Sequence, residues 1–189
     1  KARDTQRFFD DGQRRTIEAA MARIIPTDYQ PGAREAGCID FLERYLSGIE
    51  SIYAKSDGSG FEALEGKRAG AWRQRIEIVR QTYRDGIVEL NRLAQDLEGS
   101  DFADLAEEAQ DRVLTALERP SRGEEAAHQE ADAVAGFAPP EPGLQQIMAE
   151  VDLDFFPMLV LHTRQGFLAD PVYGGNRDRV GWQVIGFPG

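Results

Sequence analysis

Apolar residues recur at steps of three and four between Gly70 and Leu97, and this run constrains the fold more than any other feature of the sequence. Its members are Trp72, Ile76, Val79, Tyr83, Ile87, Leu90, Leu93 and Leu97. The spacing predicts one amphipathic α-helix about 40 Å long, at about 1.5 Å per residue. Gly86 costs such a helix about 1 kcal/mol relative to alanine, which indicates a close packing contact or a bend there. Gly99 is placed to end the helix.

Shorter segments also repeat apolar residues at helical spacing. They run from a cap at Asp10 or Asp11 to Ile25, from Ala36 to Leu46, from Glu107 to Glu118 and from Leu144 to Val151, with a restart at Asp152 or Asp154 that continues to Phe167. Pro26 ends the first helix and Asp170-Pro171 ends the last, because the residue before a proline is pushed out of helical geometry. No stretch alternates as a strand, and the glycines in Lys55 to Gly60 indicate a loop.

The predicted fold class is therefore all-α: an irregular helical bundle with one long central helix and a glycine-rich non-helical C-terminal tail. We expect a single helical domain over residues 1–189. Residues 119–143 are rich in Ala, Glu, Pro and Gly and lack periodicity, which predicts a surface excursion. Residues 172–189 have no clear period and predict a tail that wraps around the bundle.

The chain is strongly acidic, with 33 acidic and 22 basic residues and a net charge of −11. Such a surface is repelled by the phosphates of nucleic acids, so no nucleic-acid partner is expected. No apolar run approaches the roughly 18 residues that a membrane-spanning helix needs, so we expect no direct membrane span.

Residues with catalytic or metal-binding chemistry are few and scattered. His128 and His162 have no companions at metal-ligand spacing, and no serine lies in a nucleophile elbow. We therefore expect no catalytic residue, no cofactor and no metal site in this chain. His162 is placed near the end of a helix, where a protonated ring would suit the helix dipole, and a structural role is favoured. Cys38 is the single cysteine; a small buried residue is the favoured interpretation, and a bridge to another chain stays open.

Aromatic side chains lie beside glycine-rich backbone in the last part of the chain. Phe167, Tyr173, Trp182 and Phe187 can either close the protein's own core or anchor a partner. We favour the core role for Trp182, and for Tyr173 to Arg177 the two interpretations are equal.

Two stretches resemble the small subunit of gluconate 2-dehydrogenase, called subunit 3. The first contains Arg7-Phe8-Phe9, Ile24 to Asp28, Pro31 to Gly37 and Ile39 to Leu42; the second contains His162-Thr163, Gly166-Phe167, Asp170 to Asp178, Val180 to Trp182 and Ile185 to Gly189. The second is the more specific, because it joins a helix stop, a Tyr-Gly-Gly-Asn turn, a Gly-Trp pair and a Gly-Phe-Pro-Gly run. Residues 119–143 depart from the family pattern and resemble an insertion.

The resemblance implies a non-catalytic accessory subunit of a membrane-bound sugar or polyol dehydrogenase. Its partner would be a large glucose-methanol-choline-type flavoprotein that binds FAD and oxidises a sugar, sugar acid or polyol. A cytochrome c subunit with haem c would pass the electrons onward. The small subunit would support folding or stability of the large one, and it often bears the twin-arginine leader that exports both to the periplasm. No leader is visible in this sequence: it was removed, export relies on the partner, or this member stays inside.

The residues expected at the partner interface come from the closing motif. They are Phe167, Asp170, Pro171, Tyr173, Gly174, Gly175, Asn176, Arg177, Trp182 and Phe187, with Cys38 as the candidate for an intersubunit disulfide. Two alternatives compete with this interpretation. One is a free-standing periplasmic helical binding or chaperone-like protein that uses residues 119–143 as its binding element, and the other is an enzyme with an unrecognised carboxylate site.

Overall fold

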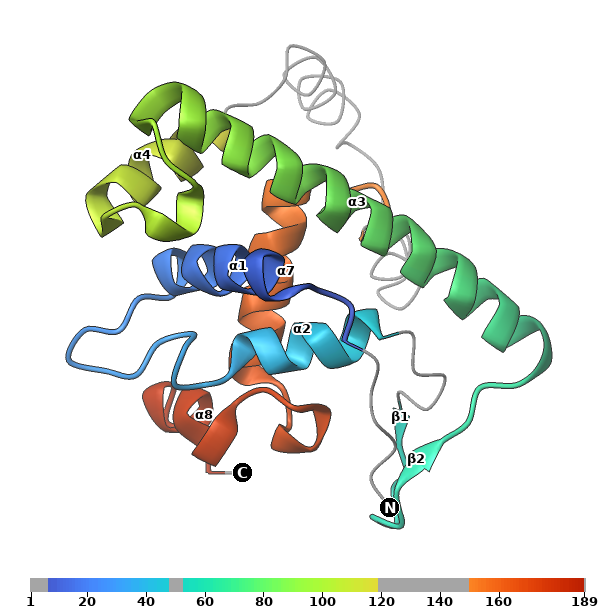
Figure 1. The fold of residues 1–189 in the computed structure, drawn as a ribbon. Helices are drawn as coiled ribbons and strands as arrows, with labels where there is room; N and C mark the ends of the chain where they lie inside the picture. The colour runs from blue at the N-terminus through green and yellow to red at the C-terminus, as the bar shows by residue number, and fades with distance from the viewer. Residues whose placement is uncertain (1–6, 48–52, 119–149, 189) are drawn as a thin grey trace, which may run out of the picture.

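Helices of unequal length build the structure, a computed structural model that describes residues 7–47, 53–118 and 150–188. In chain order they are α1 (Asp11–Ile24), α2 (Cys38–Leu46), α3 (Gly66–Glu98), α4 (Glu107–Leu117), α7 (Phe155–Leu168) and α8 (Val180–Val184). In Figure 1, α3 lies along one side of the molecule, and α1 and α2 pack against α7. The all-α prediction with one long helix is confirmed. The predicted excursion at 119–143 and the helix start at 144–149 lie outside the described residues, and the single-domain assignment stays a prediction.

The first helix begins and ends where its sequence predicts. Asp10 accepts a hydrogen bond from the Gln13 backbone N–H at 2.8 Å, and the Gln13 side chain accepts one from the Asp10 N–H at 3.2 Å. This reciprocal cap satisfies two backbone donors that a helix start leaves without partners. The helix ends at Ile24, two residues before Pro26.

Helix α3 is longer than its apolar run, with 33 residues from Gly66 to Glu98. Gly99 ends it in the left-handed conformation at φ 75°, as predicted. The prediction of a close packing contact or a bend at Gly86 is also confirmed, because a β-carbon on Gly86 would overlap the ring of Phe155 on α7. The missing side chain therefore lets α3 and α7 approach closely at this point.

A small hairpin departs from the sequence prediction, which contained no strand. β1 (Tyr53–Ala54) pairs antiparallel with β2 (Phe61–Glu62) around the predicted loop at Lys55 to Gly60. Two-residue strands are too short to alternate visibly, so sequence periodicity cannot reveal them.

The C-terminal tail is more helical than predicted. It contains two 3₁₀ turns, η2 (Pro171–Tyr173) and η3 (Arg177–Arg179), and then α8. The prediction of a non-helical tail is wrong in this detail, because single turns are too short to give a helical period and local caps stabilise them. Asp170, for example, caps η2 by accepting from the Val172 N–H at 2.9 Å.

The core lies where α1, α2, α3 and α7 meet. Its largest fully buried side chains include Ile17, Leu42, Tyr83, Phe102, Met158 and His162. Phe102 belongs to η1 (Phe102–Asp104), just before α4. No helix in the described ranges combines the length and the apolar character needed to cross a membrane.

Candidate functional site

The residues from Ala169 to Pro188, here named the C-terminal segment, pack against the end of α7 and the start of α2 (Figure 1). Asn176 fixes this segment. It is fully buried, its Nδ2 donates to the Ala169 carbonyl at 2.9 Å, and its Oδ1 accepts from the Gly181 N–H at 2.8 Å. One amide therefore clasps the two ends of the turn, and its own backbone sits in the left-handed region at φ 47°.

Two glycines allow the segment to touch α7 backbone to backbone. A β-carbon on Gly175 would overlap the carbonyl of Gly166, and one on Gly181 would overlap the carbonyl of Phe167. Neither collision can be relieved by a side-chain movement, because the opposing atoms belong to the main chain. The glycines of the closing motif are therefore explained by packing.

Charged groups tie the segment to the first helices. Arg177 pairs with Asp40 at 2.5 Å, and Arg14 pairs with the other oxygen of the same carboxylate at 2.6 Å. The Arg177 N–H also donates to the Ala36 carbonyl at 2.9 Å. Residues from α1, α2 and the C-terminal segment thus meet at Asp40, although Asp40 and Arg177 are 137 positions apart in sequence.

Tyr173 joins the segment to the hairpin. Its hydroxyl accepts from the Ala54 N–H at 3.1 Å, and its ring lies edge-on to Phe61 with the centroids 5.8 Å apart. The guanidinium of Arg44 lies 4.5 Å from the centre of the same Phe61 ring. The family motif residue Tyr173 therefore holds the hairpin in place.

The far end of the segment is apolar and exposed. Trp182 is half-buried, its Nε1 donates to the Leu168 carbonyl at 2.8 Å, and its ring lies edge-on to Phe187 at 5.1 Å. Ile185 and Phe187 are 60% and 51% exposed. Trp182 is therefore an anchor near the surface and not the core residue that its sequence context favoured.

The structure divides the residues predicted at a partner interface into buried and accessible groups. The buried ones are Phe167, Gly175 and Asn176; the half-buried ones are Pro171, Tyr173, Gly174 and Trp182; the exposed ones are Asp170, Arg177 and Phe187. The buried residues build the segment from within, so an interface formed by this segment would be made by its exposed members.

Cys38 is buried at the start of α2, and burial raises the pKa of its thiol to about 12. A protonated, inaccessible thiol reacts poorly, because the thiolate is the nucleophile in disulfide chemistry. A bridge from Cys38 to another chain would require this region to open, and the disulfide stays a prediction.

A buried polar cluster that the sequence did not reveal joins α2, α3 and α7. Glu150, only 3% exposed, accepts from the Tyr45 hydroxyl at 2.8 Å and lies 2.8 Å from His162 Nε2, and it pairs with Arg75. The Tyr83 hydroxyl lies 2.8 Å from His162 Nδ1. We name these five residues the Glu150 cluster. The sequence could have indicated the burial of one member, because His162 follows Met158 by four positions and Leu159 by three, which places it on the same apolar helix face.

His162 is neutral in this cluster. Burial and the nearby Arg75 charge lower its pKa to about 3. The neutral ring satisfies the geometry if Nε2–H donates to Glu150 and Nδ1 accepts from Tyr83. The prediction that His162 lies near the end of a helix is wrong, since the residue lies inside α7 and is fully buried.

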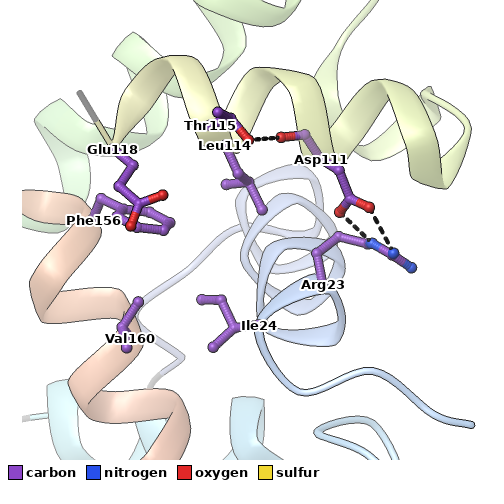
Figure 2. Close-up of a pocket in the computed structure, with 8 residues that line it drawn as sticks. All are labelled: Arg23, Ile24, Asp111, Leu114, Thr115, Glu118, Phe156 and Val160. Carbon is purple, nitrogen blue, oxygen red and sulfur yellow. Dashed lines mark hydrogen bonds and ion pairs between the residues drawn. The ribbon is translucent and has the colours of Figure 1, made fainter.

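A shallow groove of about 400 Å³ lies between α1, α4 and α7 (Figure 2). Ile24, Leu114, Phe156 and Val160 form its apolar lining. The Arg23 guanidinium at its edge binds Asp111 through two contacts of 2.7 and 2.9 Å, so this charge is used within the protein. In the described part of the chain, no group of three histidine, cysteine or acidic residues could hold a metal ion.

These features define a small helical protein whose C-terminal segment is fixed against α7 by Asn176 and exposes apolar side chains such as Ile185 and Phe187. The family model of gluconate 2-dehydrogenase subunit 3 matches residues 11–189. The chain belongs to the gluconate 2-dehydrogenase subunit 3 family, which confirms the resemblance found in the sequence. It is thus assigned to an accessory subunit of a dehydrogenase complex, which implies a catalytic partner. Neither a curated protein nor a solved structure matched the chain.

Proposed function

We propose that this chain is the non-catalytic small subunit that binds and stabilises an FAD-dependent, glucose-methanol-choline-type dehydrogenase. The observation that carries the proposal is the family match over residues 11–189, which includes the whole C-terminal segment. The partner would bind FAD and oxidise a sugar, sugar acid or polyol, and gluconate is the first substrate to test. A cytochrome c subunit would accept the electrons through haem c.

The distribution of polar groups in the chain supports a structural role. In the buried Glu150 cluster, Glu150 and His162 bind partners within the protein, and Arg23 is engaged by Asp111. The C-terminal segment, in contrast, exposes several large apolar side chains, such as Ile185 and Phe187. Exposed apolar side chains that cluster on one face are typical of surfaces that another protein covers.

We place the complex in the periplasm, with export directed by a twin-arginine leader on one of its subunits. Fractionation of the native host tests this placement: the chain and the flavoprotein should appear together in the periplasmic fraction. Their presence in the cytoplasmic fraction would contradict it.

Co-expression with the flavoprotein encoded next to this chain tests the central proposal. The complex is separated by size exclusion and followed by flavin absorbance and dye-linked gluconate oxidation. We expect this chain to co-elute with the yellow, active protein, and we expect the large subunit expressed alone to be insoluble or inactive.

The opposite result identifies the alternative function. If the flavoprotein is fully active alone and this chain elutes as a separate stable monomer, the accessory role is refuted. A free-standing helical binding or chaperone-like protein would then explain the chain better.

A further inference from the structure

The last nine described residues carry no charged side chain in a highly charged protein, and the charge that lies against them is the Arg179 guanidinium, 6.0 Å from the centre of the Trp182 ring. Residues 180–188 contain no Asp, Glu, Lys or Arg, whereas 29% of the whole chain is charged. Within this run, all residues from Gln183 to Pro188 are exposed. Among the described residues, half of the exposed large apolar side chains lie between Leu168 and Phe187. Depletion of charge together with exposed apolar side chains distinguishes the centre of a protein interface from ordinary surface.

The backbone that carries the exposed side chains is held by hydrogen bonds within the protein, such as the one from the Phe187 N–H to the Trp182 carbonyl at 2.8 Å. Asn176, Asp178 and Arg179 have φ angles of 47°, 55° and 60°, a left-handed conformation that non-glycine residues rarely adopt. The buried Asn176 amide and the Gly175 and Gly181 contacts with α7 maintain this strained backbone. A backbone that is already fixed loses little conformational entropy on binding, so less of the free energy of the apolar contacts is offset when the complex forms.

Charge argues against a second copy of the chain as the occupant. Each copy carries a net charge of −11, so two copies brought together repel one another. The family match supplies a different occupant, because a subunit of a dehydrogenase complex implies a catalytic partner.

We infer that Leu168, Trp182, Val184, Ile185 and Phe187, here named the C-terminal face, are the surface that docks onto the catalytic subunit. The complementary surface of that subunit is an uncharged apolar patch. The inference rests on the proposed function and narrows it to one face of the molecule. The buried motif residues Gly175, Asn176 and Gly181 contribute indirectly, because they hold the backbone of the face in position without contacting the partner.

Charge introduced into the face tests the inference. Ile185→Glu and Phe187→Glu are each co-expressed with the flavoprotein, and Ile185→Ser serves as a milder change at the same position. Val88→Glu on α3 is the matched control, since Val88 is 70% exposed and Ile185 is 60% exposed. Melting temperatures of the isolated chains verify that each variant folds.

We expect each Glu variant in the face to lower the affinity for the flavoprotein at least tenfold, and we expect Val88→Glu to change it less than twofold. If the wild-type complex forms and the face variants bind equally well, the inference is overturned while the proposed function stands. If the wild-type chain does not bind the flavoprotein at all, the proposed function itself fails. If light scattering shows a dimer of the isolated chain that the face variants dissociate, with flavoprotein binding unchanged, the face serves self-association and the inference is again overturned.

Discussion

Replacing Glu150 by alanine should destabilise the protein more than any other single change of a carboxylate in the described chain. Glu150 lies at the centre of the Glu150 cluster, where it receives hydrogen bonds or charge from Tyr45, His162 and Arg75. The Glu150→Ala variant removes every one of these acceptor atoms and leaves three donors inside the protein.

The magnitude follows from the exposure of the three donors. His162 is fully buried, so its N–H would have no access to water, and an unsatisfied donor of this kind costs about 1–3 kcal/mol. The Tyr45 hydroxyl adds about 1 kcal/mol. Arg75 is 20% exposed, so water can replace part of its lost interaction. The total is about 3–5 kcal/mol, the range measured when one member of a buried ion pair is removed.

Thermal and urea unfolding measure this loss. For a chain of this size we expect the melting temperature to fall by roughly 10–15 °C. Glu150→Gln keeps the shape and one carbonyl oxygen, which can accept from both His162 and Tyr45 as Oε1 does, but its amide nitrogen cannot accept from Arg75, so its cost should be smaller, about 1–2 kcal/mol. Glu62→Ala is the control, because Glu62 is exposed on β2. A cost for Glu150→Ala that equals the cost for Glu62→Ala would refute the assignment of Glu150 as the centre of the cluster.

Three further predictions follow from the same structure. Gly86→Ala should lower the free energy of unfolding by about 1–3 kcal/mol, because the new methyl group overlaps Phe155. Gly70 has open space around it on the same helix, so Gly70→Ala should stabilise the protein by up to about 1 kcal/mol. Equal effects of the two variants in urea unfolding would contradict the close contact at Gly86. Lowering the pH from 7.5 to 5 should reduce the free energy of unfolding by about 2 kcal/mol through His162. The folded pKa of about 3 lies below the unfolded value near 6.5, so protons bind preferentially to the unfolded chain as the pH falls through 6.5. The His162→Gln variant should flatten this part of the stability profile, and a profile that this variant leaves unchanged would disprove a neutral His162. Asn176→Ala should cost about 2–4 kcal/mol, since it removes both hydrogen bonds of a buried clasp in the left-handed region; a loss below about 1 kcal/mol in the same assay would show that the clasp is not needed.

The helices were predictable because their signals are local. The apolar run of α3, the Asp10 cap and the stop before Pro26 each act within a few residues, so the sequence alone carries them. Gly86 is an instructive intermediate case. Its cost to the helix indicated a packing contact, but only the folded chain identifies Phe155 as the contacting residue.

The Glu150 cluster and the division within the C-terminal segment were not predictable in the same way. Tyr45 lies 105 positions from Glu150, and Glu150 lies 12 positions before His162 and outside α7, so no helical spacing relates the three. The family motif identified Asn176 and Phe187 as a group, yet one is fully buried and the other is 51% exposed. Whether a residue is buried depends on which segments of backbone pack against each other, and the residue types in a motif do not specify that packing.

The pairing of Arg177 with Asp40 has a consequence for biosynthesis. The two residues are 137 positions apart, so at roughly 5–20 residues per second the ribosome needs roughly 7–27 seconds to add Arg177 after Asp40. Throughout this interval the start of α2 lacks its covering segment and is available to a chaperone. The catalytic subunit, in turn, would meet the complete C-terminal face only after residue 187 has been added, when the helices before it have already been synthesised.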